Sequence, residues 1–261
     1  MLTRIGIAFL LLSAVSNADE RGAFVTLDRA DHDKIVSVGL AGSFAGDDNG
    51  SDFSLRASFY GRYAGEDGGA YAQIAFSAAQ HIHDWQGGVT NLELGGMAFS
   101  RVGDVDVIWR AGLALPTATS DPGGATANLL AFTDRILDYP LVVPETAWIR
   151  PGIALRFGNA SFFGQVDGGL DLPISKAGGR YGAMTMGHLN GGIGGDYGSI
   201  ALTGELANDI FSGIHMLHSV TVSIRWHESG LQPYLAAGVA FDDSDFATRA
   251  SLTVGLHIRP Q

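Results

Sequence analysis

Arginines at alternating positions are the residues of this chain best placed to do chemistry. Each lies in a segment where large apolar residues alternate with small or polar ones, and the set is Arg56, Arg62, Arg110, Arg150, Arg156 and Arg225. Residues of the same parity add acids and amides, namely Glu93, Asp106, Gln165, Asp167 and Glu205. Because side chains alternate across a strand with period two, these groups share one face of a sheet. Such a face could select a charged solute, or ladders of Arg with Asp and Glu could simply hold the wall together.

Histidines raise the alternative of a metal site. His81 and His83 are two residues apart in one predicted loop, and His188 and His215 lie near two others. A His-x-His pair on a strand sets two imidazoles on one face, which is acceptable geometry for a metal. No carboxylate or cysteine set with ligand spacing accompanies them. We therefore expect exposed histidines at the rim of the fold, with no metal and no other cofactor.

A serine hydrolase is the third chemistry that the residues suggest. His218 and Ser219 are adjacent, but neighbours on a strand point to opposite faces, so they cannot form the hydrogen bond that a nucleophile needs from its base. No Gly-x-Ser-x-Gly elbow occurs in a strand–turn–helix context. The sequence predicts that the chain is not an enzyme, and a lipid hydrolase at the rim stays open as an alternative.

Period-two segments are the elements that would position these residues. Near the C-terminus, Leu252, Val254 and Ile258 alternate with Thr253 and His257. Twelve such segments are predicted, with 10 or 14 as alternative counts: 35–45, 53–63, 70–78, 89–100, 104–115, 146–157, 160–172, 187–195, 199–207, 214–226, 231–241 and 249–259. The predicted fold class is all-β, a closed antiparallel up-and-down transmembrane β-barrel.

Composition decides which face of the strands looks outward. Charged residues are 16% of the chain, against about 25% in soluble domains, and its only lysines are Lys34 and Lys176. Too little charge is present to coat a soluble surface, so we expect the aliphatic face to meet lipid and the arginine face to line a lumen. The net charge of −11 argues against nucleic acid as a partner.

The N-terminal residues read as a leader followed by an unassigned segment. Residues 1–18 carry Arg4, an apolar core and a small-residue cleavage site, which predicts a secretory signal peptide. Residues 19–34 could be a plug, a short extra strand or a disordered arm. Residues 35–261 form the predicted barrel.

The connections alternate in length. Tight turns at 101–103, 158–159, 196–198 and 227–230 contrast with longer loops at 79–88, 116–145, 173–186, 208–213 and 242–248. Long loops of such barrels face the outside, which would leave both termini periplasmic. Aromatic residues are predicted to form two girdles. One holds Tyr60, Tyr63, Tyr71, Phe157, Tyr197, Trp226 and Tyr234, and the other Phe44, Trp85, Trp148 and Phe241.

The loop 116–145 is predicted to carry a helix of its own. Within 125–137, apolar residues recur at helical spacing, and Asp134, Arg135 and Asp138 lie beside them. An amphipathic helix here could fold into the lumen and constrict it, or it could cap the rim.

With its alternating strands and the C-terminal segment TVGLHI at 253–258, the chain resembles the outer-membrane β-barrel superfamily of Gram-negative bacteria, and in particular its small porin-like channels. The resemblance implies an outer-membrane location, contact with outer-membrane lipid and passage of a small solute. A rim-active lipid hydrolase and a structural or adhesive barrel that binds a partner through acidic loops are the alternatives. The solute and the oligomeric state stay open.

Overall fold

Antiparallel strands make up most of the computed structural model, which describes residues 24–25, 27, 35–47, 50–81, 84–159, 161–174, 184–211, 216–226, 231–242 and 248–258. The strands are β1 Ile35–Asp47, β2 Gly50–Ala64, β3 Gly68–His81, β4 Asp84–Val89, β5 Leu92–Val102, β6 Val105–Leu115, β7 Trp148–Gly158, β8 Phe162–Pro173, β9 Met186–Asp196, β10 Ile200–Phe211, β11 Met216–Trp226, β12 Leu231–Asp242 and β13 Arg249–Ile258.

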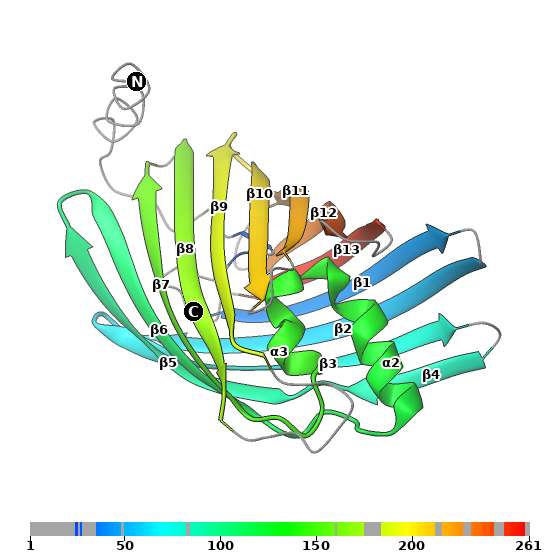
Figure 1. Cartoon of the computed structure of the whole chain (residues 1–261). Coiled ribbons are helices and arrows are strands. Elements are labelled where there is room, and N and C mark those ends of the chain that lie inside the picture. Colours follow the sequence, from blue (N-terminus) through cyan, green and yellow to red (C-terminus); the bar gives the residue numbers. More distant parts are fainter. Residues whose placement is uncertain are drawn as a thin grey trace, which may run out of the picture.

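Neighbours in the sequence are neighbours in the sheet, and the sheet closes on itself (Figure 1). The closure is the pairing of β1 with both β2 and β13. Because β4 and β5 follow one another along the same edge of β3, they count as one wall strand, which gives a closed up-and-down barrel of twelve strands. The predicted fold class is confirmed.

Two predicted loops are wrong in extent. In place of a loop at 79–88, residues 76–81 of β3 pair with 84–89 of β4. Likewise β10 continues to Phe211, into the predicted loop 208–213. Backbone pairing needs no side chain, so Gly87 and Gly88 remain in the ladder.

The aliphatic face of the wall points outward. In β13, Leu252 and Val254 are 54% and 48% exposed, whereas Thr253 between them is buried. Exposed aliphatic or aromatic side chains recur at alternate positions of the other strands as well. A soluble barrel would hide this face, so its exposure is what a lipid-facing wall requires.

The predicted aromatic girdles are wrong for four residues. Tyr60, Tyr71, Tyr234 and Trp148 are buried, the last with no exposed surface. Along their strands these four residues alternate in step with the inward polar residues, so their rings point inward. Tyr63, Tyr197, Trp226, Phe44, Trp85 and Phe241 are exposed, as a girdle requires.

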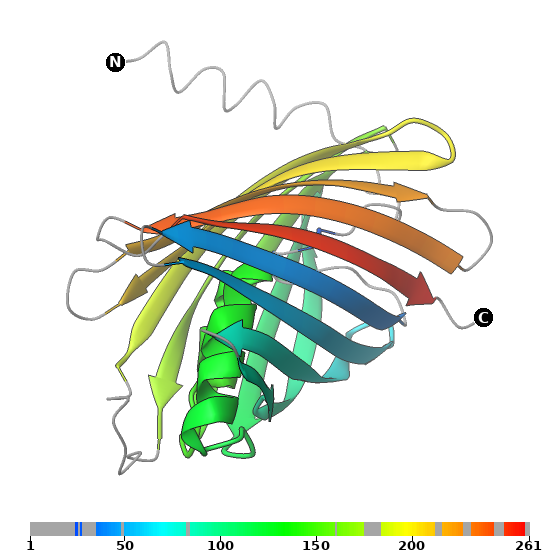
Figure 2. The same ribbon diagram turned by 90° about the vertical axis from the view of Figure 1, so that its right-hand side faces the viewer.

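Residues 116–147, which we name the inserted loop, join β6 to β7 and lie within the barrel (Figure 2). The loop contains α2 Pro122–Ala131, η1 Phe132–Asp134, η2 Ile136–Asp138 and α3 Tyr139–Val142. The predicted helix is thus broken into short pieces. Asp121 caps α2, since its side chain accepts a hydrogen bond of 2.9 Å from the amide of Gly124.

The inserted loop contacts opposite parts of the wall. Its α2 packs against β2, β3 and β4, η1 contacts β1, β12 and β13, and η2 contacts β10 and β11. The approach is close at Gly88 of β4, where a Cβ would lie 2.5 Å from the carbonyl oxygen of Gly124. In the described part of the chain, no helix is long and apolar enough to cross a membrane.

Substitution of the outer face tests its contact with lipid. Val222, near the middle of β11, is 59% exposed, and Val102, at the end of β5, is 69% exposed. We expect Val222→Arg to lower the free energy of unfolding by about 2–4 kcal/mol, and Val102→Arg by about 1 kcal/mol or less. Urea unfolding in lipid vesicles, followed by tryptophan fluorescence, measures both. Equal costs at the two positions would contradict a bilayer around this face.

Candidate functional site

Arg56 on β2 is the wall residue that binds the inserted loop most directly. One of its terminal nitrogens lies 2.9 Å from Oδ1 of Asp134, and the other lies 2.5 Å from Oδ2 of Asp138. Arg135, between these acids in the chain, donates to the other oxygen of Asp138 at 2.7 Å. All four side chains are buried or nearly so. The structure therefore brings the three predicted loop residues together with a predicted lumen arginine.

A second cluster surrounds Arg150 on β7. This arginine donates to Oδ1 of Asp171 at 2.7 Å, to the carboxylate of Glu93, and to the carbonyl of Leu137 at 2.5 Å. Glu93 also accepts from Tyr71 and Gln73, each at 2.6 Å. A Cβ at position 112 would clash with Glu93 and Tyr71, so Gly112 makes room for this cluster.

The two loop aspartates differ in their acidity. Burial raises the pKa of Asp134, although the positive charge of Arg56 acts to lower it. Burial also disfavours the Asp138 carboxylate, but Arg135, Arg56 and Arg150 outweigh it and lower the pKa of Asp138 to about 2. The stability that Asp138 contributes is therefore present above its unfolded pKa near 4 and is lost only as the pH falls through about 2. Near neutral pH, Asp138 is a carboxylate.

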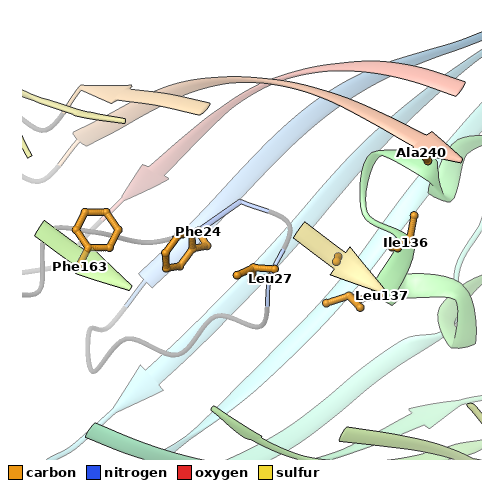
Figure 3. Packing of buried hydrophobic residues seen from close by; sticks show 7 residues of the cluster. Phe24, Leu27, Ile136, Leu137, Phe163 and Ala240 are labelled. Carbon is orange, nitrogen blue, oxygen red and sulfur yellow. The ribbon is translucent and has the colours of Figure 1, made fainter. Parts of the chain in front are cut away.

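Residues of the unassigned segment 19–34 also lie inside the barrel. The amides of Val25 and Leu27 donate to the carboxylate of Glu205 at 2.8 and 3.2 Å, and Arg135 donates to the carbonyl of Leu27 at 3.3 Å. Phe24 and Leu27 pack in one apolar cluster with Ile136, Leu137, Phe163, Ala207 and Ala240 (Figure 3). The described part of this segment and the inserted loop thus contact each other directly.

Asn91, which the sequence gave no reason to select, anchors the inserted loop. It lies at the break between β4 and β5, with no exposed surface. Its Nδ2 donates toward the carbonyls of Pro140, Val143 and Thr146 at 2.8–3.3 Å, and its Oδ1 accepts from the amide of Ala118 at 2.8 Å. One amide side chain therefore bonds both ends of the loop. The sequence offers no periodic signal for such a role.

The remaining predicted lumen residues also point inward. Arg62, Asp106, Arg156, Gln165, Asp167, Glu205 and Arg225 are each 5% exposed or less, and Arg110 is half-buried. Asp167 accepts from Gln165 at 2.8 Å and from Asn190 at 2.7 Å, and Asp106 binds Arg101 at 2.6 Å. Asp167 and Asp106 are thus bonded to other wall residues, so the wall has polar bonds of its own.

A small cavity adjoins Arg56. Its lining includes Arg56, Tyr60, Gln73, Asp134 and Tyr234, and the space accessible to the centre of a water molecule is about 20 Å³. That is room for a water molecule or two, and no larger ligand fits beside the loop in this conformation.

The histidine predictions have different outcomes. The side chains of His81, His83 and His215 lie outside the described residues. His188 is buried, not exposed as expected, and its Nδ1 is 3.8 Å from Asp171. Its inward parity on β9 explains the difference. No group of three potential metal ligands occurs among the described residues.

His218 and Ser219 face opposite sides of β11. Ser219 is buried, while His218 is half-buried on the outer side, where its Nδ1 is 2.7 Å from Oδ1 of Asn208. This geometry excludes the pair as a catalytic dyad.

Comparisons with known proteins support the fold class alone. No family model and no curated protein sequence matches the chain. Among solved structures, the NanC porin is 9% identical with a TM-score of 0.56, over 85% of this chain and 100% of that one. An outer-membrane channel from Pseudomonas putida F1 is 10% identical with a TM-score of 0.53, over 89% and 99% of the two chains. The chain thus has the fold of an outer-membrane β-barrel of the small porin-like type.

Asn91→Ala tests the anchoring of the inserted loop. It leaves buried carbonyls without their donor, so we expect a loss of about 1–3 kcal/mol in the free energy of unfolding and faster proteolysis within residues 116–147. Gel analysis of limited digests of the folded protein measures the second effect. Asn159→Ala, in a turn where Asn159 accepts from the amides of Ser161 and Phe162, is the matched control. Equal protection of the loop in both variants would contradict this role of Asn91.

Proposed function

We propose that the chain is an outer-membrane channel that passes a small solute through a charged lumen, and that the inserted loop constricts or closes it. The observation that carries the proposal is the pairing of Arg56 in the wall with two carboxylates of the loop. The fold it shares with known outer-membrane channels also supports the proposal. Both termini would lie on the periplasmic side, as in other barrels with an even number of strands.

The pore-lining residues in this proposal are the inward polar residues of the wall. They are Arg56, Arg62, Glu93, Asp106, Arg110, Arg150, Arg156, Gln165, Asp167, Glu205 and Arg225. Asp134, Arg135 and Asp138 would form the constriction. Fixed charges act strongly on ions in a confined space of low dielectric constant, so this wall would discriminate between solutes by charge.

A structural barrel without transport is the second candidate, and the filled interior favours it. The inserted loop and residues Phe24, Val25 and Leu27 occupy the lumen in this conformation. Conductance separates the two candidates, because a channel must open and a structural barrel need not.

Shortening the inserted loop tests the constriction. Replacement of residues 124–138 by a short Gly-Ser linker removes both Arg56 partners, and we expect a larger single-channel conductance in planar bilayers. Replacement of the exposed turn residues 65–67 at the other end of the barrel is the control and should leave conductance unchanged. A loop variant that folds but conducts no better than the wild type, or not at all, would favour a structural barrel.

Charge substitution tests the lumen assignment. Arg62→Gln and Arg225→Gln each remove a buried inward charge, so the double variant should shift the reversal potential under a salt gradient toward cations. Arg101→Gln removes one positive charge, half as many as the double variant, from a side chain that is 53% exposed at a turn, and we expect less than half of the shift. Identical reversal potentials in the wild type, the double variant and Arg101→Gln would show that ions do not pass through this interior.

A further inference from the structure

Arg56 and Arg150 differ in where their partners come from. Both carboxylates that bind Arg56 belong to the inserted loop. Both carboxylates that bind Arg150 belong to the wall, Glu93 on β5 and Asp171 on β8. If the loop leaves the lumen, Arg150 keeps its two ion pairs and loses the hydrogen bond to the carbonyl of Leu137 and the nearby charge of Asp138. Arg56 loses all of its ion pairs.

Loss of the loop would therefore leave the guanidinium of Arg56 facing the vacated lumen without either counter-charge. Its side chain is 2% exposed while the loop is in place, so departure of the loop opens the site to the lumen. Arg135 leaves with the loop and does not compensate. A dissolved anion and the two aspartates compete for this one guanidinium, so anion binding favours the open state and the two are coupled.

The surroundings of Arg56 indicate which anion would fit. Its natural ligands in the closed state are carboxylates, each held through one nitrogen, and the guanidinium fork can bind both oxygens of a single carboxylate. Beside the apolar Val25, Phe59, Ile74 and Leu141, the lining of the adjoining cavity includes hydroxyl and amide side chains, from Ser58, Tyr60, Gln73, Tyr234 and Thr253. These groups suit a small organic acid with hydroxyl groups.

We propose that Arg56 is the binding residue for the carboxylate of a small organic acid, and that Asp134 and Asp138 occupy its place while the channel is closed. The solute would then open its own path by competing with the loop for one guanidinium. This inference rests on the proposed channel function and adds the chemical class of the solute.

The experiment follows the position of the loop and the conductance separately. Thr133 in η1 is buried, and the chain has no cysteine, so Thr133→Cys gives a single label site that is protected while the loop is inserted. The folded protein in lipid vesicles is treated with a maleimide in lactate, in the uncharged analogue lactamide, or in phosphate, with chloride holding the ionic strength constant. We expect lactate to accelerate labelling about tenfold, and lactamide and phosphate to have little effect.

Two matched variants connect the response to Arg56. Arg56→Gln should label rapidly with or without lactate, because the ion pairs that join the two aspartates to β2 are lost. Arg101→Gln removes the same charge from a side chain that is 53% exposed at a turn and does not line the lumen, so it should keep the lactate response. If Arg56→Gln fails to fold, the double variant Asp134→Asn with Asp138→Asn releases the loop without altering the wall, and it should also label rapidly in the absence of lactate.

The outcomes separate the two proposals. A lactate response that survives in Arg56→Gln, or acceleration by phosphate equal to that by lactate, would overturn the assignment. If lactate does not change the labelling rate at position 133 in a protein that conducts, the assignment of Arg56 is also wrong, while the channel function stands. A lactate response in a protein that never conducts would support the carboxylate site and reject the channel.

Discussion

Buried ion pairs between inward arginines and carboxylates are the interaction on which the interior depends. The outer face must be apolar to meet lipid, so the polar half of each strand is directed into a small enclosed space. A charge in such a space is costly unless it is paired and hydrogen-bonded. Arg56 and Arg150 each have two carboxylate partners, and Glu93 is shared among Arg150, Tyr71 and Gln73. Each group is stable in the lumen because its neighbours are present, so the cluster behaves as a unit.

The alternation of side chains along each strand was enough to predict the wall. Period-two alternation located all twelve strands and gave the direction of Arg56, Arg150, Arg156 and Arg225, because a charge cannot face lipid cheaply. The same rule, applied to Trp148, would have placed it inside beside Arg150. The girdle prediction failed there because it used the distance of a residue from the strand end and ignored its parity. The buried position of His188 was open to the same reasoning.

The contents of the lumen could not be predicted in the same way. A helical pattern in 125–137 fits both a rim cap and an inserted loop, since the pattern records one apolar face and not what covers it. The bonds that fix the location join residues far apart in the sequence, such as Asn91 with Val143 and Val25 with Glu205. A single asparagine at a strand break has no periodic signature. Contacts of this kind follow from the folded geometry and cannot be read from local sequence.

The number of strands explains why a loop is needed inside at all. The side chains of an eight-stranded barrel nearly fill it, whereas barrels of sixteen or more strands hold an aqueous channel. Twelve strands leave space that wall side chains alone do not fill, and here the inserted loop and residues Phe24, Val25 and Leu27 enter it. Wall pairs such as Asp167 with Asn190 join strands that the backbone ladder already holds together. The loop is held by side-chain bonds and by a few backbone bonds, such as that from the amide of Asn91 to the carbonyl of Leu141, and none of these belongs to that ladder. Its release would therefore leave the barrel closed and its backbone pairing intact, so the filling of the lumen can change without unfolding of the wall.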